Sequence, residues 1–131
     1  MSFREIIAAA TNSLWTKAAS AICLLFIIVY SLIPQTERVN TGFPGKIEHI
    51  LAYSVTGLLL GLSIPSKNGP LLAAAHLAWI AALLEFLQQW SPGRHPRVSD
   101  AVISTVAGAV GAALAAWLRK RAETDFRPPG N

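Results

Sequence analysis

Polar side chains with catalytic or binding chemistry gather at the ends of apolar stretches in this chain. Lys46, His49 and Tyr53 have i, i+3 and i+7 spacing, which places them on one stripe of a helix. Glu85 and Gln88 have i, i+3 spacing near the end of a later apolar stretch. A histidine beside a carboxylate can act as a general base, while an ammonium, a phenol and an amide can bind and orient an anion.

A short basic turn, residues 91–97, follows Glu85 and leads to Asp100 at the start of the next apolar stretch. It carries Arg94 and Arg97, and guanidinium groups bind phosphate and carboxylate groups well. Charges at a membrane boundary are costly, so such a cluster indicates a functional site. We predict an anion-binding site in which Arg94 contacts the anion, the acids hold the basic residues in place, and the other polar residues orient the bound group.

An intramembrane enzyme is the alternative interpretation of the same residues. His49 next to Glu85 or Asp100 could serve as the general base, with Arg94 stabilising developing charge on a lipid-linked substrate. No serine stands in a recognisable nucleophile motif. His49 also lacks a second histidine at metal-ligand spacing, so we predict no metal site and no cofactor. A transporter, a proton relay and a structural membrane subunit are further alternatives.

The composition predicts that membrane helices position these residues. Of the 131 residues, 53% are hydrophobic and 14% are charged, and the mean hydropathy is +0.45. Crossing a hydrocarbon core takes about 20 mostly apolar residues. Four stretches approach this length: residues 15–33, 47–64, 71–90 and 101–118. Because their connections are short, we predict an all-α polytopic membrane protein, an antiparallel four-helix transmembrane bundle over residues 15–121.

The two ends of the chain differ from this bundle in composition. Residues 1–14 mix Phe3 and isoleucines with charged side chains, a pattern that predicts an amphipathic segment at the membrane interface. Residues 122–131 end in Arg-Pro-Pro-Gly-Asn and predict a disordered cytoplasmic tail. The structured part of the chain is therefore expected to be one membrane domain.

The distribution of basic residues predicts the orientation. If the helices alternate in direction, seven basic residues fall on one side of the membrane: Arg4, Lys17, Lys67, Arg119, Lys120, Arg121 and Arg127. Four fall on the other side: Arg38, Lys46, Arg94 and Arg97. The positive-inside rule then places both termini in the cytoplasm, with loops 34–46 and 91–99 facing outward. The net charge of +4 is explained by this topology, so we predict no nucleic-acid partner.

Small residues predict where helices approach closely. Gly57 and Gly61 form a GxxxG pattern, and Gly108 and Gly111 lie in an alanine-rich stretch. Glycine lets membrane helices pack closely where lipid removes the hydrophobic driving force. We predict that these glycines pack within the chain; the alternative is a homodimer through the same faces.

Short motifs along residues 31–111 resemble the VanZ-like family of small bacterial membrane proteins. The motifs are Ser31-Leu32-Ile33-Pro34, Lys46-x-x-His49-x-x-x-Tyr53, Glu85-x-x-Gln88 and Pro92-Gly93-Arg94, followed by Asp100 and a glycine-rich helix. They occur in the family's order. The chain departs from the family's common pattern at three positions, with Gly45 in place of an acid, Ser104 in place of an asparagine and Ala107 in place of a glycine.

The resemblance implies a place in the cell envelope. The family is named for a teicoplanin-resistance determinant, which lowers susceptibility to a lipoglycopeptide that targets cell-wall precursors at the outer membrane surface. For this chain it implies membrane lipids as partners, together with a cell-wall precursor or another anionic envelope lipid. An outward-facing polar pocket, derived above from charge counts, is consistent with that association.

Overall fold

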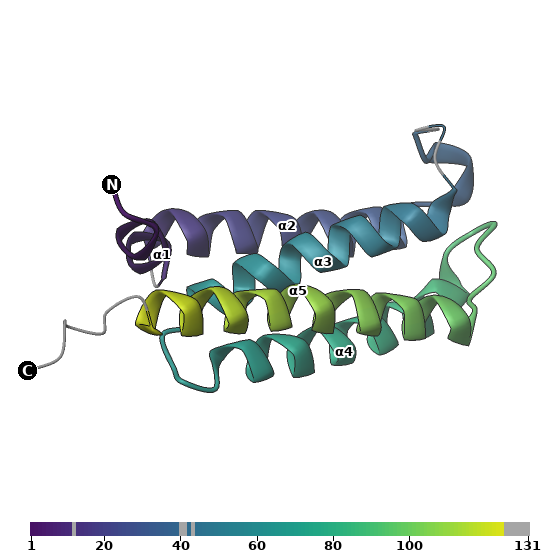
Figure 1. Ribbon diagram of the computed structural model, residues 1–131. Helices are drawn as coiled ribbons and strands as arrows, with labels where there is room; N and C mark the ends of the chain where they lie inside the picture. Colours follow the sequence, from purple (N-terminus) through teal and green to yellow (C-terminus); the bar gives the residue numbers. More distant parts are fainter. Residues whose placement is uncertain (12, 40–41, 43, 125–131) are drawn as a thin grey trace, which may run out of the picture.

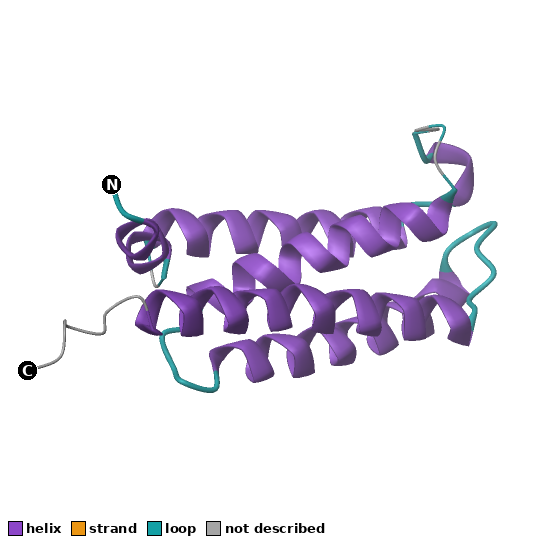
Figure 2. Cartoon of the chain, viewed as in Figure 1, coloured by secondary structure: helices purple, strands orange, loops and turns teal. Residues whose placement is uncertain are grey.

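A computed structural model describes residues 1–11, 13–39, 42 and 44–124. The described residues form α-helices and two short 3-10 helices, and no strand (Figure 2). In chain order the elements are α1 (Phe3–Ala10), α2 (Leu14–Leu32), η1 (Gln35–Glu37), α3 (Gly45–Ser63), α4 (Gly69–Leu87), η2 (Gln88–Trp90) and α5 (Val98–Thr124). The all-helical prediction is confirmed for this part of the chain.

Local sequence signals explain the ends of α2. The helix begins after Ser13, whose hydroxyl accepts a 3.0 Å hydrogen bond from the amide of Thr16, an N-cap interaction. It ends at Leu32, before Ile33 and Pro34, because a proline disfavours helical conformation in the residue that precedes it. These signals fix the point at which the chain leaves α2 and turns toward the polar site.

Four long helices, α2, α3, α4 and α5, lie alongside one another (Figure 1). The most extensive contact joins α3 to α5, while α2 packs mainly on α3 and only slightly on α4. The core shared by these helices consists of Ile27, Tyr53, Leu77, Ala81, Leu84 and Ala107. Helix α2 is therefore the most loosely attached of the four.

Glycines account for the closeness of α3 and α5. A Cβ atom on Gly57 would overlap the backbone carbonyl of Gly108, and one on Gly111 would overlap the carbonyl of Ser54. A Cβ atom on Gly61 would lie 2.8 Å from that of Ala115. The predicted glycine faces thus meet within the chain. A homodimer through small residues would have to use other positions.

Three helices are long and apolar enough to cross a membrane: Leu14–Leu32, Gly69–Trp90 and Val98–Thr124. Helix α3 is 19 residues long, as α2 is, but it is not apolar enough to belong to this set. Its first turns carry Lys46, Glu48 and His49, which lower its hydropathy. The membrane prediction is supported for three helices, and the crossing by α3 stays a prediction.

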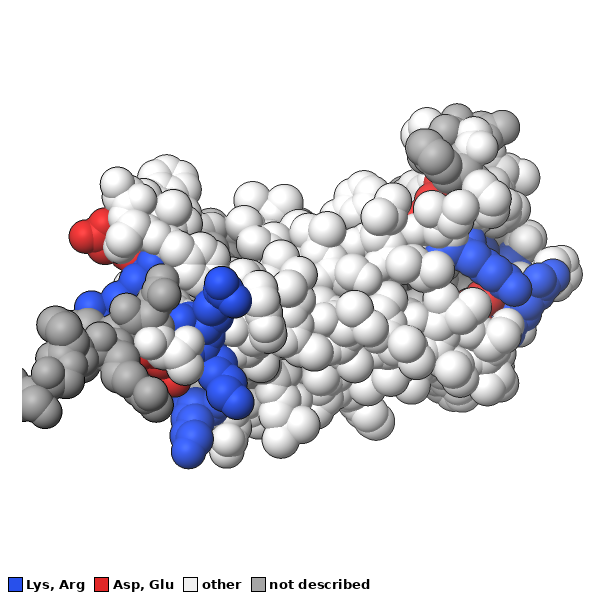
Figure 3. All heavy atoms as spheres, viewed as in Figure 1, with Lys and Arg blue, Asp and Glu red and all other residues white. Residues whose placement is uncertain are grey.

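Charge and apolar surface are segregated along the molecule. Figure 3 shows Lys, Arg, Asp and Glu gathered at the two ends, with a broad uncharged waist between them. Large apolar side chains are exposed on the long helices, including Phe26, Leu71 and Trp79. Such an extensive exposed apolar surface is expected of a protein surrounded by lipid.

The terminal helices differ from the sequence-based boundaries. Helix α1 has a capping box between Ser2 and Glu5, buries Ile7 and contacts α5, lying across the end of the long helices (Figure 1). Helix α5 begins at Val98 and continues to Thr124, so residues 122–124 are helical instead of belonging to a disordered tail. The rest of that predicted tail, residues 125–131, lies outside the described residues.

Candidate functional site

The sequence-predicted polar residues lie toward the end of the molecule that holds the α2–α3 and α4–α5 connections (Figure 1). Residues from four elements contribute: the end of α2 with η1, the first turns of α3, the end of α4, and loop 91–97 with the start of α5. The two connections are joined by a backbone hydrogen bond of 3.2 Å from the amide of Gln35 to the carbonyl of Pro92. These segments therefore meet at one end of the molecule.

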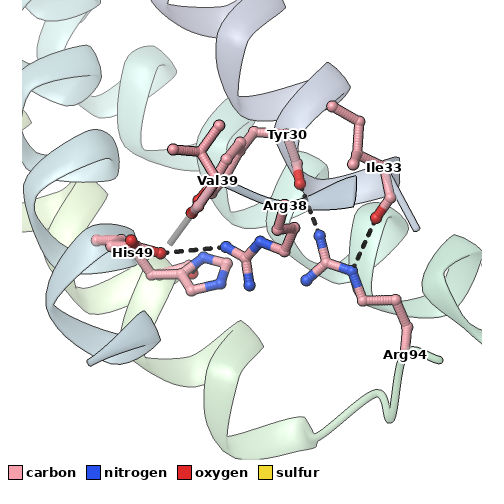
Figure 4. A network of polar contacts seen from close by, with 8 residues as sticks. Tyr30, Ile33, Arg38, Val39, His49 and Arg94 are labelled. Carbon is pink, nitrogen blue, oxygen red and sulfur yellow. Dashed lines mark hydrogen bonds and ion pairs between the residues drawn. The ribbon is translucent and has the colours of Figure 1, made fainter. Parts of the chain in front are cut away.

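Arg94 joins the α4–α5 connection to the end of α2 by hydrogen bonds (Figure 4). Its Nη2 donates to the carbonyl oxygen of Tyr30 at 2.6 Å, and its Nε donates to that of Ile33 at 3.2 Å. Ser91 Oγ donates to the carbonyl of Leu32 at 2.9 Å. The last carbonyls of a helix lack partners within the helix, and a cation is favourable at that end. Arg94 and Ser91 together cap α2 from a distant part of the chain.

Glu85 fastens the same loop from the other side. Its carboxylate accepts a hydrogen bond from the backbone amide of Arg97, the residue directly before α5. The first amides of a helix are free to donate, and a negative charge is favourable there. We expected Glu85 or Asp100 to hold Arg94 directly, and this expectation is wrong for the described contacts. The carbonyls of α2 take the guanidinium, and the amide of Arg97 takes the carboxylate.

Asp100 lies within the first turn of α5, which begins at Val98. The sequence places Asp100 at the start of an apolar stretch, and the structure begins the helix two residues earlier, so Ser99 and Asp100 both lie inside it. The hydroxyl of Ser99 donates to Asp100 Oδ1 at 3.3 Å. An acid in the first turn remains favourable because of the helix dipole.

Arg38 is a candidate site residue that the sequence patterns did not indicate. It forms an ion pair with Glu48 at 3.2 Å, and its guanidinium lies 4.3 Å from the ring centre of Tyr30. The side chains of Arg38 and Glu48 are only 15% and 20% exposed. Among the described residues, Arg38 Nε is buried and has no hydrogen-bond partner. A buried donor left unpaired is costly, so this atom indicates a place where a ligand acceptor could bind.

The two arginines lie next to each other. Figure 4 shows the guanidinium groups of Arg38 and Arg94 side by side, close to His49. Burial lowers the pKa of the Arg94 guanidinium, and the charge of Arg38 lowers it further. Two neighbouring cations repel each other, and an anion between or beside them would relieve that repulsion.

The remaining predicted residues divide into two groups. His49 is half-buried, with Nδ1 3.5 Å from the hydroxyl of Ser104, and Tyr53 and Gln88 are buried. Lys46 and the side chain of Arg97 are exposed. The carboxylate–imidazole contact of the enzyme interpretation does not occur among the hydrogen bonds of the described residues. Those residues also contain no group of three or more His, Cys, Asp and Glu side chains placed to hold a metal ion.

A groove of about 750 Å³ extends from this polar cluster between α2 and α3. The end next to the polar cluster is lined by Tyr30, Arg38, Glu48 and His49. Its remaining walls are mainly apolar and include Ile22, Cys23, Phe26, Leu51, Ala52 and Val55. The volume is within the range of small-molecule sites, about 300–1,000 Å³. The combination can accept an amphiphile, with a polar group at one end and a hydrocarbon along the helices.

In comparisons with known proteins, no family model, no curated protein and no solved structure matched this chain.

Proposed function

We propose that the protein crosses a bacterial cytoplasmic membrane four times, on α2, α3, α4 and α5, with both termini in the cytoplasm. The segregation of charge to the two ends supports this arrangement (Figure 3). Helix α3 is as long as α2 and packs extensively on α5, so it would cross in the company of its neighbours. Of the seven basic residues assigned to the cytoplasmic side, Arg127 lies outside the described residues. The polar cluster then faces outward.

We further propose that the outward-facing cluster binds an anionic lipid-linked or cell-surface group. The unpartnered, buried Nε of Arg38 beside the guanidinium of Arg94 carries this proposal. A phosphate or carboxylate oxygen would satisfy the free donor, and two adjacent guanidinium groups would stabilise its charge. His49, half-buried at the same end of the groove, can donate or accept one further hydrogen bond.

The motif resemblance supports a role in the cell envelope. In the VanZ-like family that role is associated with resistance to teicoplanin, which targets cell-wall precursors at the outer membrane surface. Two of the residues that carry the resemblance lie at the polar cluster: His49 lines the groove, and Arg94 donates a hydrogen bond to the carbonyl of Ile33. We propose the same envelope context for this chain.

Lipid extraction tests the binding proposal. The full chain is purified in mild detergent, and the lipids that remain bound are identified and counted by mass spectrometry. We expect wild-type protein to retain anionic lipid above the level of neutral lipid, and Arg38→Gln to retain about tenfold less, since a charged hydrogen bond contributes about 1.5–3 kcal/mol. Lys67→Gln, an exposed residue at the other end, serves as the control. Equal retention by wild type and Arg38→Gln would overturn the proposal.

A further inference from the structure

The groove between α2 and α3 is open to the surroundings along its length. Phe26 and Ile22 on α2 are 58% and 67% exposed, and Leu51 and Val55 on α3 are 58% and 49% exposed. These four residues line the groove and form its rim. In a membrane, such a rim faces the lipid chains directly. A hydrocarbon could therefore enter from the side, without passing through water.

Small residues make room inside the groove. Cys23 on α2 and Ala52 on α3 both line it, and both are only partly buried. Close packing would normally eliminate such a space, because unfilled volume loses dispersion contacts. From Ile22 to Tyr30 the wall of α2 extends for about 12 Å at the rise of a helix. The groove therefore runs along the helices, the direction in which the hydrocarbon chain of a lipid would lie.

We propose that one acyl chain of an anionic phospholipid occupies this groove, with its phosphate at Arg38. The inference rests on the proposed anion binding and names its ligand class. Charge complementarity selects an anionic head group, because the groove ends at Arg38, whose buried Nε has no hydrogen-bond partner among the described residues. Glu48 already pairs with Nη2 of the Arg38 guanidinium, so the phosphate would accept from the unpartnered Nε. The lipid would hold the loosely packed α2 against α3.

Photo-crosslinking shows where the acyl chain of the lipid lies on the protein. The full-length protein is placed in phosphatidylcholine nanodiscs containing phosphatidylglycerol with a photoactivatable group midway along one acyl chain. We expect crosslinks to concentrate on the groove-facing residues of α2 and α3. In the Arg38→Gln variant, this labelling should fall about tenfold. A phosphatidylcholine probe with the same chain should label the groove weakly.

Two variants that fill the groove test its role separately from the charge. Cys23→Phe narrows the groove from its α2 wall, and Val55→Trp covers the rim on α3. Because Val55 is exposed, the larger side chain there leaves the core undisturbed. Both should reduce groove labelling several-fold while keeping the fold, checked by thermal unfolding. Ala21→Phe, on an exposed position of α2 outside the groove, is the matched control and should label as wild type does.

The outcomes separate this inference from the proposed function. If phosphatidylglycerol retention depends on Arg38 but labelling lies outside the groove and ignores Cys23→Phe and Val55→Trp, the groove inference is wrong and anion binding stands. If inorganic phosphate stabilises the wild type but not Arg38→Gln, and phosphatidylglycerol is not retained, the site takes a free anion and the groove inference is again wrong. If neither probe depends on Arg38, both proposals fail.

Discussion

Arg94 Nη2 lies 2.6 Å from the backbone carbonyl oxygen of Tyr30, which is 64 residues earlier in the chain. The aromatic ring of the same tyrosine lies under the guanidinium of Arg38, at 4.3 Å. Tyr30 therefore links both arginines, one through its backbone and one through its ring. This link brings the cation that caps α2 beside the cation that we propose binds a ligand.

Removing the Arg94 side chain should destabilise the protein by loosening the end of α2. Arg94→Gln cannot reproduce both hydrogen bonds to the carbonyls of Tyr30 and Ile33, and we expect a loss of about 1–3 kcal/mol in unfolding free energy. The measurement is thermal or denaturant unfolding in detergent. Arg97→Gln, whose side chain is exposed, is the control and should change stability little. Equal effects of the two variants would contradict the capping role.

Replacing Gly111 with alanine should destabilise the fold, although the same change usually stabilises a helix by about 1 kcal/mol. Its new Cβ would overlap the carbonyl of Ser54 on α3 and force the two helices apart. Gly45→Ala is the matched control, because nothing lies within 4 Å of a Cβ at that position. Unfolding in detergent compares the two. A Gly111→Ala variant as stable as wild type would show that α3 and α5 are not in close contact.

Labelling of introduced cysteines should reveal the orientation. Cys23, the only native cysteine, is first replaced by serine. A cysteine at His95, an exposed position in loop 91–97, should react with an impermeant reagent in intact cells. A cysteine at Asn68, in the loop at the opposite end, should react only after the membrane is opened. The reverse pattern would place the polar cluster in the cytoplasm.

Charge changes on either side of the Arg38–Glu48 pair should have opposite effects on anion binding. Glu48→Gln removes a carboxylate that competes for the guanidinium, so retention of anionic lipid should rise several-fold, whereas Arg38→Gln should lower it. Glu37→Gln changes an exposed acid in η1 and should have little effect. Lipid retention counted by mass spectrometry is the measurement. A fall in retention with Glu48→Gln would mean that the pair binds ligand as a unit or only holds the loop.

The helices, and the glycines that permit close packing between them, could be predicted from the sequence. The length of each apolar stretch and the prolines and glycines between the stretches determine where the helices form, and these signals are local. The glycines of α3 and α5 were also recognisable, since only the smallest residue permits such close backbone approach. The polar first turns of α3 obscured its apolar character, because the same residues serve the site and lower the hydropathy of the helix.

The partners of the charged side chains were decided only by the tertiary structure. Arg94 and Glu85 bind backbone carbonyls and a backbone amide at helix ends, and every residue type presents the same backbone groups, so no pattern identifies them. Arg38 stands in a loop with no periodicity, and its pairing with Glu48 and Tyr30 depends on how that loop folds back. Sequence determined which residues reach this end of the molecule. Each charged side chain there could bind either an unpaired backbone group at a helix end or a side chain of opposite charge, and the tertiary structure determined which partner it has.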